Sequence, residues 1–434
     1  MRDYSGAAVI VLLLIFALFW LVPCEAVQAD EKTELTVAVG EVGIEYETVV
    51  TAAEMYMEEN PDISIELVES PEPSEERLSY FLNYFERESP EIDIFQIDVI
   101  WPGILAEHLV DLYELGAEEH LEGHFDFVIE NNTTTAGELI AMPWFVDAGM
   151  LYYRADLLDE YGLDLPETWC ELEEKARIIM EGEREENPQF YGYVWQGDAY
   201  EGLTTNVLEW FASNDGGRIV SPEGEVTVLN DNNEYMLNKA AGWIGDISPR
   251  GVTGFLEEDA RAIWHEGNAA FMRNWPYAYG LSQESEQIEE FGVTRIPAGP
   301  EGESASALGG WHLGVSDYSE NVQEAAEFAF YLAGEEVQKL RAVEASLPPT
   351  IIDLYDDEEV LEANPYFAEF FDMFEEAVPR PSSQTAPYYD AVSEIVFTEA
   401  HSALTGAQDP LSALENMQLG IEDILGRGVE DIDI

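Results

Sequence analysis

Hydrophobic residues follow two different periods over the first hundred positions of the chain. Residues 34–39 and 63–70 alternate as half-buried strands do, and residues 92–101 (IDIFQIDVIW) form the nearly continuous apolar run of a buried parallel strand. Between these runs, residues 46–61 and 74–90 carry apolar side chains at helical spacing, and the second stretch opens with a cap-like Ser-Glu-Glu. This strand–helix alternation predicts an α/β, doubly wound domain.

A second α/β block follows. Its predicted helices and strand are residues 166–182, 190–197, 203–217, 232–247 and a helix, strand and turn over 259–281. Further on we expect a strand at 291–299, a glycine-rich strand pair at 305–316, a long helix at 321–342 and a helical tail. No linker rich in proline or glycine divides the chain, which favours two lobes joined by several crossings and therefore a hinge.

The lobe boundaries follow from this pattern. We expect residues 34–143 plus 291–335 in lobe 1 and residues 144–290 plus 336–434 in lobe 2, with crossings near 144, 290 and 336. The segments ELIAMPWF and AGMLYYRADLL are expected to run as paired extended segments through the first crossing.

The charge is extreme. The chain has 90 acidic and 18 basic residues, a formal net charge of −72, and a hydrophobic fraction of 46% that still allows sizeable cores. A polyanion as partner is disfavoured, which argues against nucleic acid. Charge repulsion at this level is screened only in concentrated salt. We therefore interpret the composition as that of a halophilic protein.

The N-terminus carries an export signal, and we expect residues 1–29 to form a signal-peptide or lipoprotein-anchor region. Residues 7–22 are uninterrupted apolar positions, long for a signal peptide and short for a spanning helix. Cys24 stands where a lipoprotein is lipidated, although Pro23 departs from the usual small residue. Cleavage after Ala29 and an uncleaved anchor remain open. Cys170 has no disulfide partner and is expected half-buried on a helix.

Signatures of catalysis are weak. No phosphate loop, nucleophile elbow or dinucleotide fingerprint is present, and no cofactor is expected. His120 and His124 are four residues apart, but the glutamate between them does not fit a His-Glu zinc motif, so we expect a solvated loop there and no metal. Asn131 and Asn132 each begin a glycosylation sequon, for which a plain polar loop is the alternative.

Aromatic residues gather beside polar ones at the ends of predicted strands and at turns. These clusters are Asp98 with Trp101, Trp144 to Asp147, Trp195 to Tyr200, Asn274 to Tyr279, and Gly310 to His312. Flat aromatic rings cover the apolar face of a sugar, and carboxylates or arginines bond its hydroxyl groups. Ligands of open α/β sheets bind beyond the strand ends. This pattern is typical of a carbohydrate-binding cleft.

The same residues carry a family resemblance. IDVIW (97–101), DAGMLYYRADLL (147–158), VWQGDAYEGL (194–203), GNAAFMRNWPYAYGL (267–281) and LGGWHLGVS (308–316) occur in family order. With PETW (166–169) and AVPRP (377–381), they cover roughly residues 34–430. The chain resembles the extracytoplasmic solute-binding proteins of ABC sugar importers, and among them the archaeal-type trehalose/maltose-binding proteins.

The resemblance implies a set of ligand contacts. Arg77, Asp98, Asp147 and Arg380 would bind hydroxyl groups. Trp275, Tyr277 and Trp311 would stack on the sugar or line the cleft, and Gly310 would allow close approach. Two departures stand out. Phe145 replaces a tyrosine of that subgroup, and the loop around Glu41 is shorter, so Glu41 would have to substitute for the family's carboxylate.

The resemblance also implies a function without catalysis. A two-lobed, periplasmic-binding-protein-like fold would capture a di- or oligosaccharide such as trehalose or maltose by hinge closure. It would act as a monomer outside the cell, tethered to the outer face of the cytoplasmic membrane, and would deliver the sugar to an ABC permease with its ATPase. The alternatives are a binding protein for another polyol or small solute, and a glycoside-active enzyme.

Overall fold

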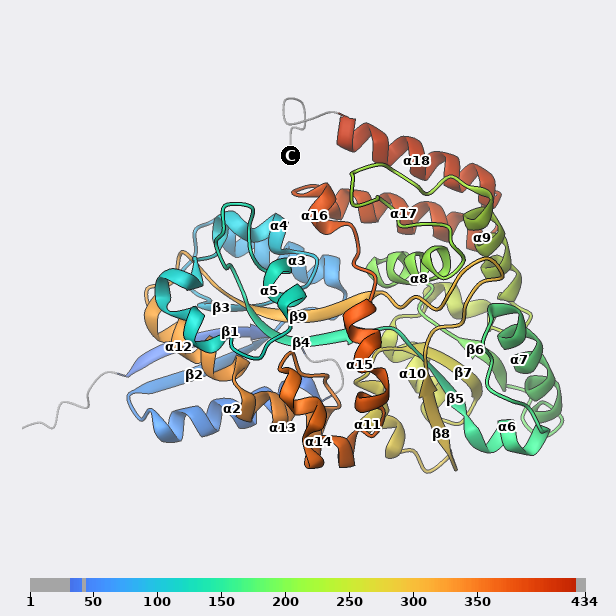
Figure 1. Cartoon of the computed structure of the whole chain (residues 1–434), viewed down its shortest axis with the longest axis horizontal. Coiled ribbons are helices and arrows are strands. Elements are labelled where there is room, and N and C mark those ends of the chain that lie inside the picture. Colours follow the sequence, from blue (N-terminus) through green and yellow to red (C-terminus); the bar gives the residue numbers. More distant parts are fainter. Residues whose placement is uncertain (1–31, 41–43, 427–434) are drawn as a thin grey trace, which may run out of the picture.

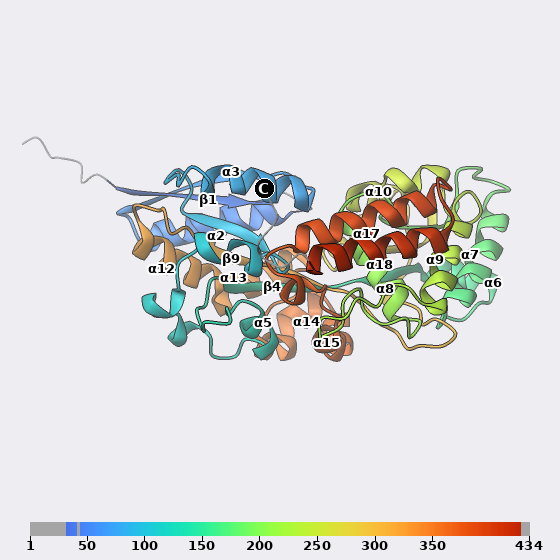
Figure 2. The same ribbon diagram turned by 90° about the horizontal axis from the view of Figure 1, so that it is seen from above.

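The protein folds into two lobes that lie next to each other along its longest axis (Figures 1 and 2). The computed structural model describes residues 32–40 and 44–426. Each lobe is built on one β-sheet covered by helices, so the predicted two-lobed α/β fold is confirmed. Within the described ranges, no helix is both long and apolar enough to cross a membrane. The predictions for Cys24, Ala29 and residues 7–22 concern positions outside these ranges.

The first lobe holds a five-stranded sheet in the order β2-β1-β3-β9-β4. β1 pairs in parallel with β2 and β3, whereas β9 runs antiparallel to both β3 and β4. The strands are β1 (Thr33–Val39), β2 (Ile63–Glu69), β3 (Ile94–Asp98), β4 (Met142–Ala148) and β9 (Leu308–Val315). The helices of this lobe are α2 (Glu45–Glu59), α3 (Ser74–Phe85), α4 (Pro102–Leu105), α5 (Asp126–Asn131), α12 (Val322–Ala333), α13 (Glu335–Ala345), α14 (Glu358–Ala363) and α15 (Tyr366–Glu376), with short 3₁₀ turns at η1 (Ala106–His108), η2 (Leu112–Leu115), η3 (Ala117–His120) and η5 (Ile352–Asp356).

The second lobe holds a four-stranded sheet in the order β6-β7-β5-β8. Its strands are β5 (Met150–Arg154), β6 (Tyr191–Val194), β7 (Ala269–Asn274) and β8 (Phe291–Thr294). Its helices are α6 (Ala155–Tyr161), α7 (Trp169–Glu183), α8 (Glu201–Ala212), α9 (Asp231–Trp243), α10 (Glu257–His265), α11 (Ala278–Gln283), α17 (Tyr389–Leu404) and α18 (Pro410–Gly426), with η4 (Arg250–Gly254). Four tryptophans with ring centroids 5.2–6.5 Å apart in their closest pairs, Trp169, Trp195, Trp210 and Trp243, fill its core.

Three segments join the lobes. The first is Gly149 alone, which separates β4 of one sheet from β5 of the other. The second runs from the end of β8 to the start of β9, and the third leaves α15 and reaches α17 through the short α16 (Ser382–Thr385) (Figure 1). The expected crossings near 290 and 336 are therefore displaced toward the C-terminus.

Several element placements differ from the expectation. β8 pairs with β5 in the second sheet instead of returning to the first lobe, because its residues continue the antiparallel ladder of β5. β4 and β5 are not paired with each other, since each belongs to a different sheet. Residues 336–376, expected in lobe 2, pack on lobe 1, with α13 against α2 and α15 against β4.

Two local predictions also need correction. The expected strand pair at 305–316 is the single strand β9, because its two edges are taken by β3 and β4. The expected long helix at 321–342 is broken into α12 and α13 at Gly334, whose ψ of 163° is extended. Ser74 does not cap α3; Pro73 holds the cap position, and the Ser74 hydroxyl donates to Asp98 Oδ2 at 3.1 Å.

Candidate functional site

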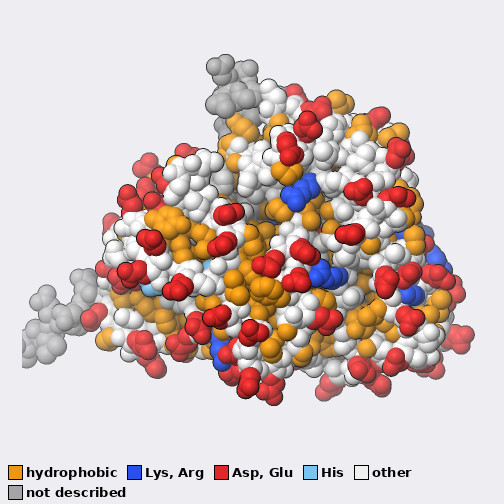
Figure 3. All heavy atoms as spheres, viewed as in Figure 1, with side chains coloured by type: hydrophobic (Ala, Val, Ile, Leu, Met, Phe, Trp, Pro, Cys, Tyr) orange, Lys and Arg blue, Asp and Glu red, His pale blue; other side chains and the backbone are white. Residues whose placement is uncertain are grey.

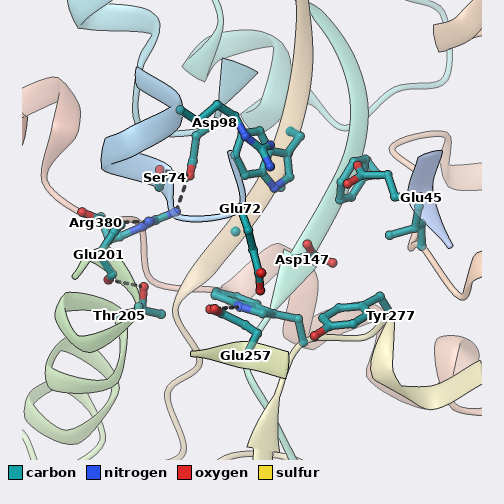
Figure 4. Close-up of a pocket in the computed structure, with 18 of the residues that line it drawn as sticks. Glu45, Glu72, Ser74, Asp98, Asp147, Glu201, Thr205, Glu257, Tyr277 and Arg380 are labelled. Atoms are coloured by element: carbon teal, nitrogen blue, oxygen red, sulfur yellow. Dashed lines mark hydrogen bonds and ion pairs between the residues drawn. The ribbon is translucent and has the colours of Figure 1, made fainter. Parts of the chain in front are cut away.

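A cleft lies between the two lobes and contains about 780 Å³ of space, part of which is open to solvent. Nine of the ten residues singled out from the sequence line it, and Glu41 lies outside the described residues. The nine are Arg77, Asp98, Phe145, Asp147, Trp275, Tyr277, Gly310, Trp311 and Arg380. Figure 4 shows several of them converging on one space.

Strand register brings the contribution of lobe 1 together. β9 lies between β3 and β4, so Trp311 is opposite Asp98 on one side and Phe145 on the other. Gly310 is opposite Val146, and Gly309 is opposite Asp147. Residues more than two hundred positions apart in the chain therefore form one continuous wall.

Glycines keep this wall flat. A Cβ atom on Gly310 would lie 2.5 Å from the carbonyl oxygen of Phe145, and the φ of +127° at Gly310 is a conformation that other residues rarely adopt. A Cβ atom on Gly309 would lie 2.8 Å from Cζ3 of Trp275, which comes from lobe 2. Glycine is thus required where the indole ring of one lobe meets the backbone of the other.

Two indole rings, one from each lobe, are each fixed in orientation by a neighbouring arginine. The Arg77 guanidinium lies 4.2 Å from the ring centre of Trp311, which also meets Trp101 edge-on at 5.5 Å. Trp275 lies 4.1 Å from the guanidinium of Arg273 and donates its Nε1–H to Glu257 Oε1 at 3.2 Å. Stacking on arginine and bonding to a carboxylate fix the orientation of a ring before any ligand arrives.

Arg380, which lies in the third crossing, joins the two lobes. Its Nη2 donates to Asp98 Oδ1 in lobe 1 at 3.2 Å, and its Nη1 donates to Glu201 Oε1 in lobe 2 at 2.8 Å (Figure 4). Glu201 accepts further bonds from Tyr389 and Ser393, both at 2.5 Å. Burial raises the pKa of Glu201, and the charge of Arg380 opposes that rise.

A second group of charges lies behind the wall. Arg341 of α13 is buried over the ring of Trp144 at 3.6 Å and pairs with Glu45 Oε1 at 3.4 Å. Glu45 also accepts a hydrogen bond from Gln96 at 2.7 Å. Asp147 is only 7% exposed, and burial, reinforced by the charge of Glu45, raises its pKa to about 8.

Comparison with known proteins decides the family. The sequence profile described as "Bacterial extracellular solute-binding protein" matches residues 41–339. The chain belongs to this family. It is 43% identical over 406 residues, 93% of its length and 96% of the relative's, to a probable ABC transporter-binding protein of Deinococcus radiodurans.

Solved members of this solute-binding class share the fold. The maltose-bound MalE3 protein of T. maritima is 35% identical, with a TM-score of 0.85 over 90% of this chain and all of that one. The GacH receptor of Streptomyces glaucescens, determined unliganded and with acarbose, is 22% identical with a TM-score of 0.81 over 91% of this chain and 99% of that one. These relatives are substrate-binding proteins, and the family is extracellular.

The structure of this solute-binding protein adds cleft residues that the sequence interpretation did not assign. They are Glu45, Glu72, Ser74, Tyr200, Glu201, Gly202, Thr205, Glu257, Gly309 and Leu347. Tyr200 and Glu201 lie within the motif VWQGDAYEGL, whose position was noted without a role. Glu45 begins α2, four residues after Glu41, which was expected to supply the family's carboxylate. The one sequence signal that could have identified these cleft residues was their position within or next to a family motif.

Other candidates lie away from the cleft. The described residues contain no group of three or more possible metal ligands. His124 is not in a solvated loop: it is buried, its Nδ1 lies 2.8 Å from Thr350 Oγ1, and burial lowers its pKa to about 4. Cys170 is exposed instead of half-buried. The amide of Asn132 is buried and donates to the Ala141 carbonyl, and that of Asn131 donates to the Val99 carbonyl, so both sequons are engaged in the fold.

Proposed function

We propose that this chain is an extracytoplasmic receptor for a di- or oligosaccharide of the trehalose or maltose type, which it delivers to an ABC permease. One observation carries the proposal. Two indole rings, Trp275 and Trp311, each fixed by an arginine, line the same interlobe cleft as several carboxylates and two guanidiniums. That combination fits the apolar faces and polar edges of a sugar. The similarity to a maltose-bound protein at 35% identity supports the same class of ligand.

Closure of the lobes gives this cleft its mechanism. The wall of β3, β9 and β4 would receive one face of the sugar, and Trp275 and Tyr277 of lobe 2 would cover the other. Rotation about the three crossings would then bury the ligand and present a closed form to the permease. The protein's own task is binding, with no bond made or broken. Tethering through Cys24 belongs to the same proposal, and mass spectrometry of the mature N-terminus tests it.

Calorimetry in concentrated salt against trehalose, maltose, sucrose, glucose and glycine betaine tests the proposal. We expect saturable binding of at least one disaccharide and a matching rise in melting temperature, because a ligand that binds only the folded state stabilises it. Trp275→Ala should weaken binding by about tenfold or more, since each 1.4 kcal/mol of lost stacking is a factor of ten.

Tyr113→Ala is a matched control, because Tyr113 is an aromatic residue with 37% of its surface exposed and lies outside the cleft. It should leave affinity unchanged. Absence of binding by every sugar would reject the proposal. Recovery of a cleaved or altered sugar after incubation would instead support a glycoside-active enzyme.

A further inference from the structure

The cleft carries more negative than positive groups. Six carboxylates line it, against the two guanidiniums of Arg77 and Arg380. The carboxylates are Glu45, Glu72, Asp98, Asp147, Glu201 and Glu257. An acidic surface is common in a chain with a net charge of −72, but a buried acidic lining is costly unless each charge is paired.

Most of these carboxylates have strong donors. Arg380 bonds to both Asp98 and Glu201. Glu45 accepts from Arg341 and Gln96. Glu257 accepts from Tyr200 Oη at 2.6 Å and from the Trp275 indole. The hydrogen-bonding capacity of these groups is thus largely used within the protein.

Asp147 differs from them. Its Oδ1 is buried and has no hydrogen-bond partner among the described residues. The two arginines whose charges act on it are already in ion pairs, Arg341 with Glu45 and Arg273 with Glu209. Figure 4 shows its carboxylate projecting into the cleft between Glu72 and Tyr277. A nearly buried acid group therefore faces the ligand space without a protein donor.

We propose that Asp147 forms a cation subsite, so that the cleft accepts a sugar bearing a protonated amine and rejects sugars bearing a carboxylate or phosphate. This inference rests on the proposed function and specifies its ligand class. An ammonium group supplies three donors and the missing positive charge, and charge-assisted bonds are about twice as strong as neutral ones. An anionic substituent would instead approach a lining that has six acidic side chains and only two guanidiniums.

The test compares sugars that differ only in charge. Calorimetry would use trehalose and maltose, their mono-amino-deoxy derivatives with the amine at each ring position in turn, and the derivatives with a 6-carboxylate, at one salt concentration and below the pKa of the amine. We expect at least one amino derivative to bind as tightly as its neutral parent or more tightly. The carboxylated sugars should bind about a hundredfold more weakly, a difference of some 2.7 kcal/mol.

The variant Asp147→Asn keeps the shape and removes the charge. The ratio of amino-sugar to neutral-sugar affinity should fall about tenfold in this variant, a loss of 1.4 kcal/mol. Glu58→Gln, at an exposed position of α2, removes one charge away from the cleft and should leave the ratio unchanged. Melting curves verify that both variants fold. The comparison of charged and neutral sugars on the wild-type protein does not depend on either variant.

Each result has one interpretation. If neutral sugars bind but every amino derivative binds more weakly than its neutral parent, the cation subsite is wrong and the proposed function stands. The same holds if Asp147→Asn leaves the ratio unchanged. If no sugar of any charge binds, both the proposed function and this inference are rejected.

Discussion

Glu75 of α3 reaches from lobe 1 across to lobe 2. Its carboxylate accepts a hydrogen bond from the backbone N–H of Glu201, the first residue of α8, and so acts as a helix cap supplied by the opposite lobe. Burial, and next the charge of Glu201, raise the pKa of Glu75 to about 8, and Asp98 adds to the rise. The ordinary value is 4.5. Contact between the lobes at this point therefore favours the protonated form of Glu75.

This contact predicts that sugar binding depends on pH. When the lobes separate, Glu75 regains water and its pKa returns toward 4.5, so closure takes up a proton. Binding coupled to closure should be strongest below pH 4.5 and weaken as pH rises toward 8, the value in the closed form. Titration calorimetry across this range, in buffers of different ionisation enthalpy, measures both the affinity and the proton uptake.

The variant Glu75→Gln isolates this effect from other acids of the cleft. Its amide still offers an oxygen to the Glu201 N–H but does not titrate. The pH dependence should be flatter in the variant than in the wild type. A wild-type affinity that rises with pH, or equal slopes in the two proteins, would contradict the assignment.

Residue identity was more predictable from the sequence than residue pairing. Asp98 and Asp147 were singled out because they lie beside aromatic residues and within motifs that match the family, whereas Arg380 came from the family resemblance alone. The sequence did not reveal that Glu45 pairs with Arg341, 296 positions away. Which arginine reaches which carboxylate depends on how α13 packs on α2, and that packing has no local signal.

At the scale of elements, periodicity identified the strands and helices but not the sheet to which each belongs. β8 was recognised as a strand and assigned to the wrong lobe, since an isolated four-residue strand carries no information about its partner. The break between α12 and α13 was missed because the apolar spacing continues across Gly334. The predicted helical tail was correct: α17 and α18 are helices, and α18 packs on α17.

Gly149, which forms the first crossing, has no space for a side chain. A Cβ atom there would lie 1.8 Å from Glu209 Oε1 and 2.5 Å from Arg273 Nη2. These two side chains form a fully buried ion pair, and Arg273 supports Trp275. Gly149→Ala should therefore lower the free energy of unfolding by about 3 kcal/mol, the lower end for breaking a buried pair, and weaken sugar binding.

Denaturant unfolding of Gly149→Ala beside Gly242→Ala measures the cost. Gly242 lies within α9 with no atom near its missing Cβ, so alanine there should be neutral or stabilise by up to about 1 kcal/mol. Equal stabilities of the two variants would show that the backbone at Gly149 moves aside freely.

At the scale of the whole molecule, acidic side chains are spread over the visible face with few basic ones among them (Figure 3). The described cations are largely engaged in ion pairs, such as Lys239 with Glu173 at 2.6 Å and Lys339 with Asp357 at 2.9 Å. Most of the surface charge is therefore uncompensated. Such a surface costs stability through repulsion that salt screens.

The melting temperature should accordingly rise as sodium chloride increases from about 0.1 M to 1 M, where the screening length falls from about 10 Å to 3 Å. Differential scanning calorimetry measures this change. Trimethylamine N-oxide, which strengthens burial by exclusion without screening charge, is the control and should raise the melting temperature less steeply at low salt. A melting temperature independent of salt would refute the halophilic interpretation.

The third crossing contributes to the cleft as well as to the connection between the lobes. Arg380 belongs to a segment on which the lobes turn, and the same side chain bonds to Asp98 and Glu201 on the cleft wall. A substitution in this segment that makes the protein close more readily would also shift the Arg380 guanidinium, which the proposed function assigns to a sugar hydroxyl. A substitution in the third crossing should therefore change lobe closure and ligand preference at the same time.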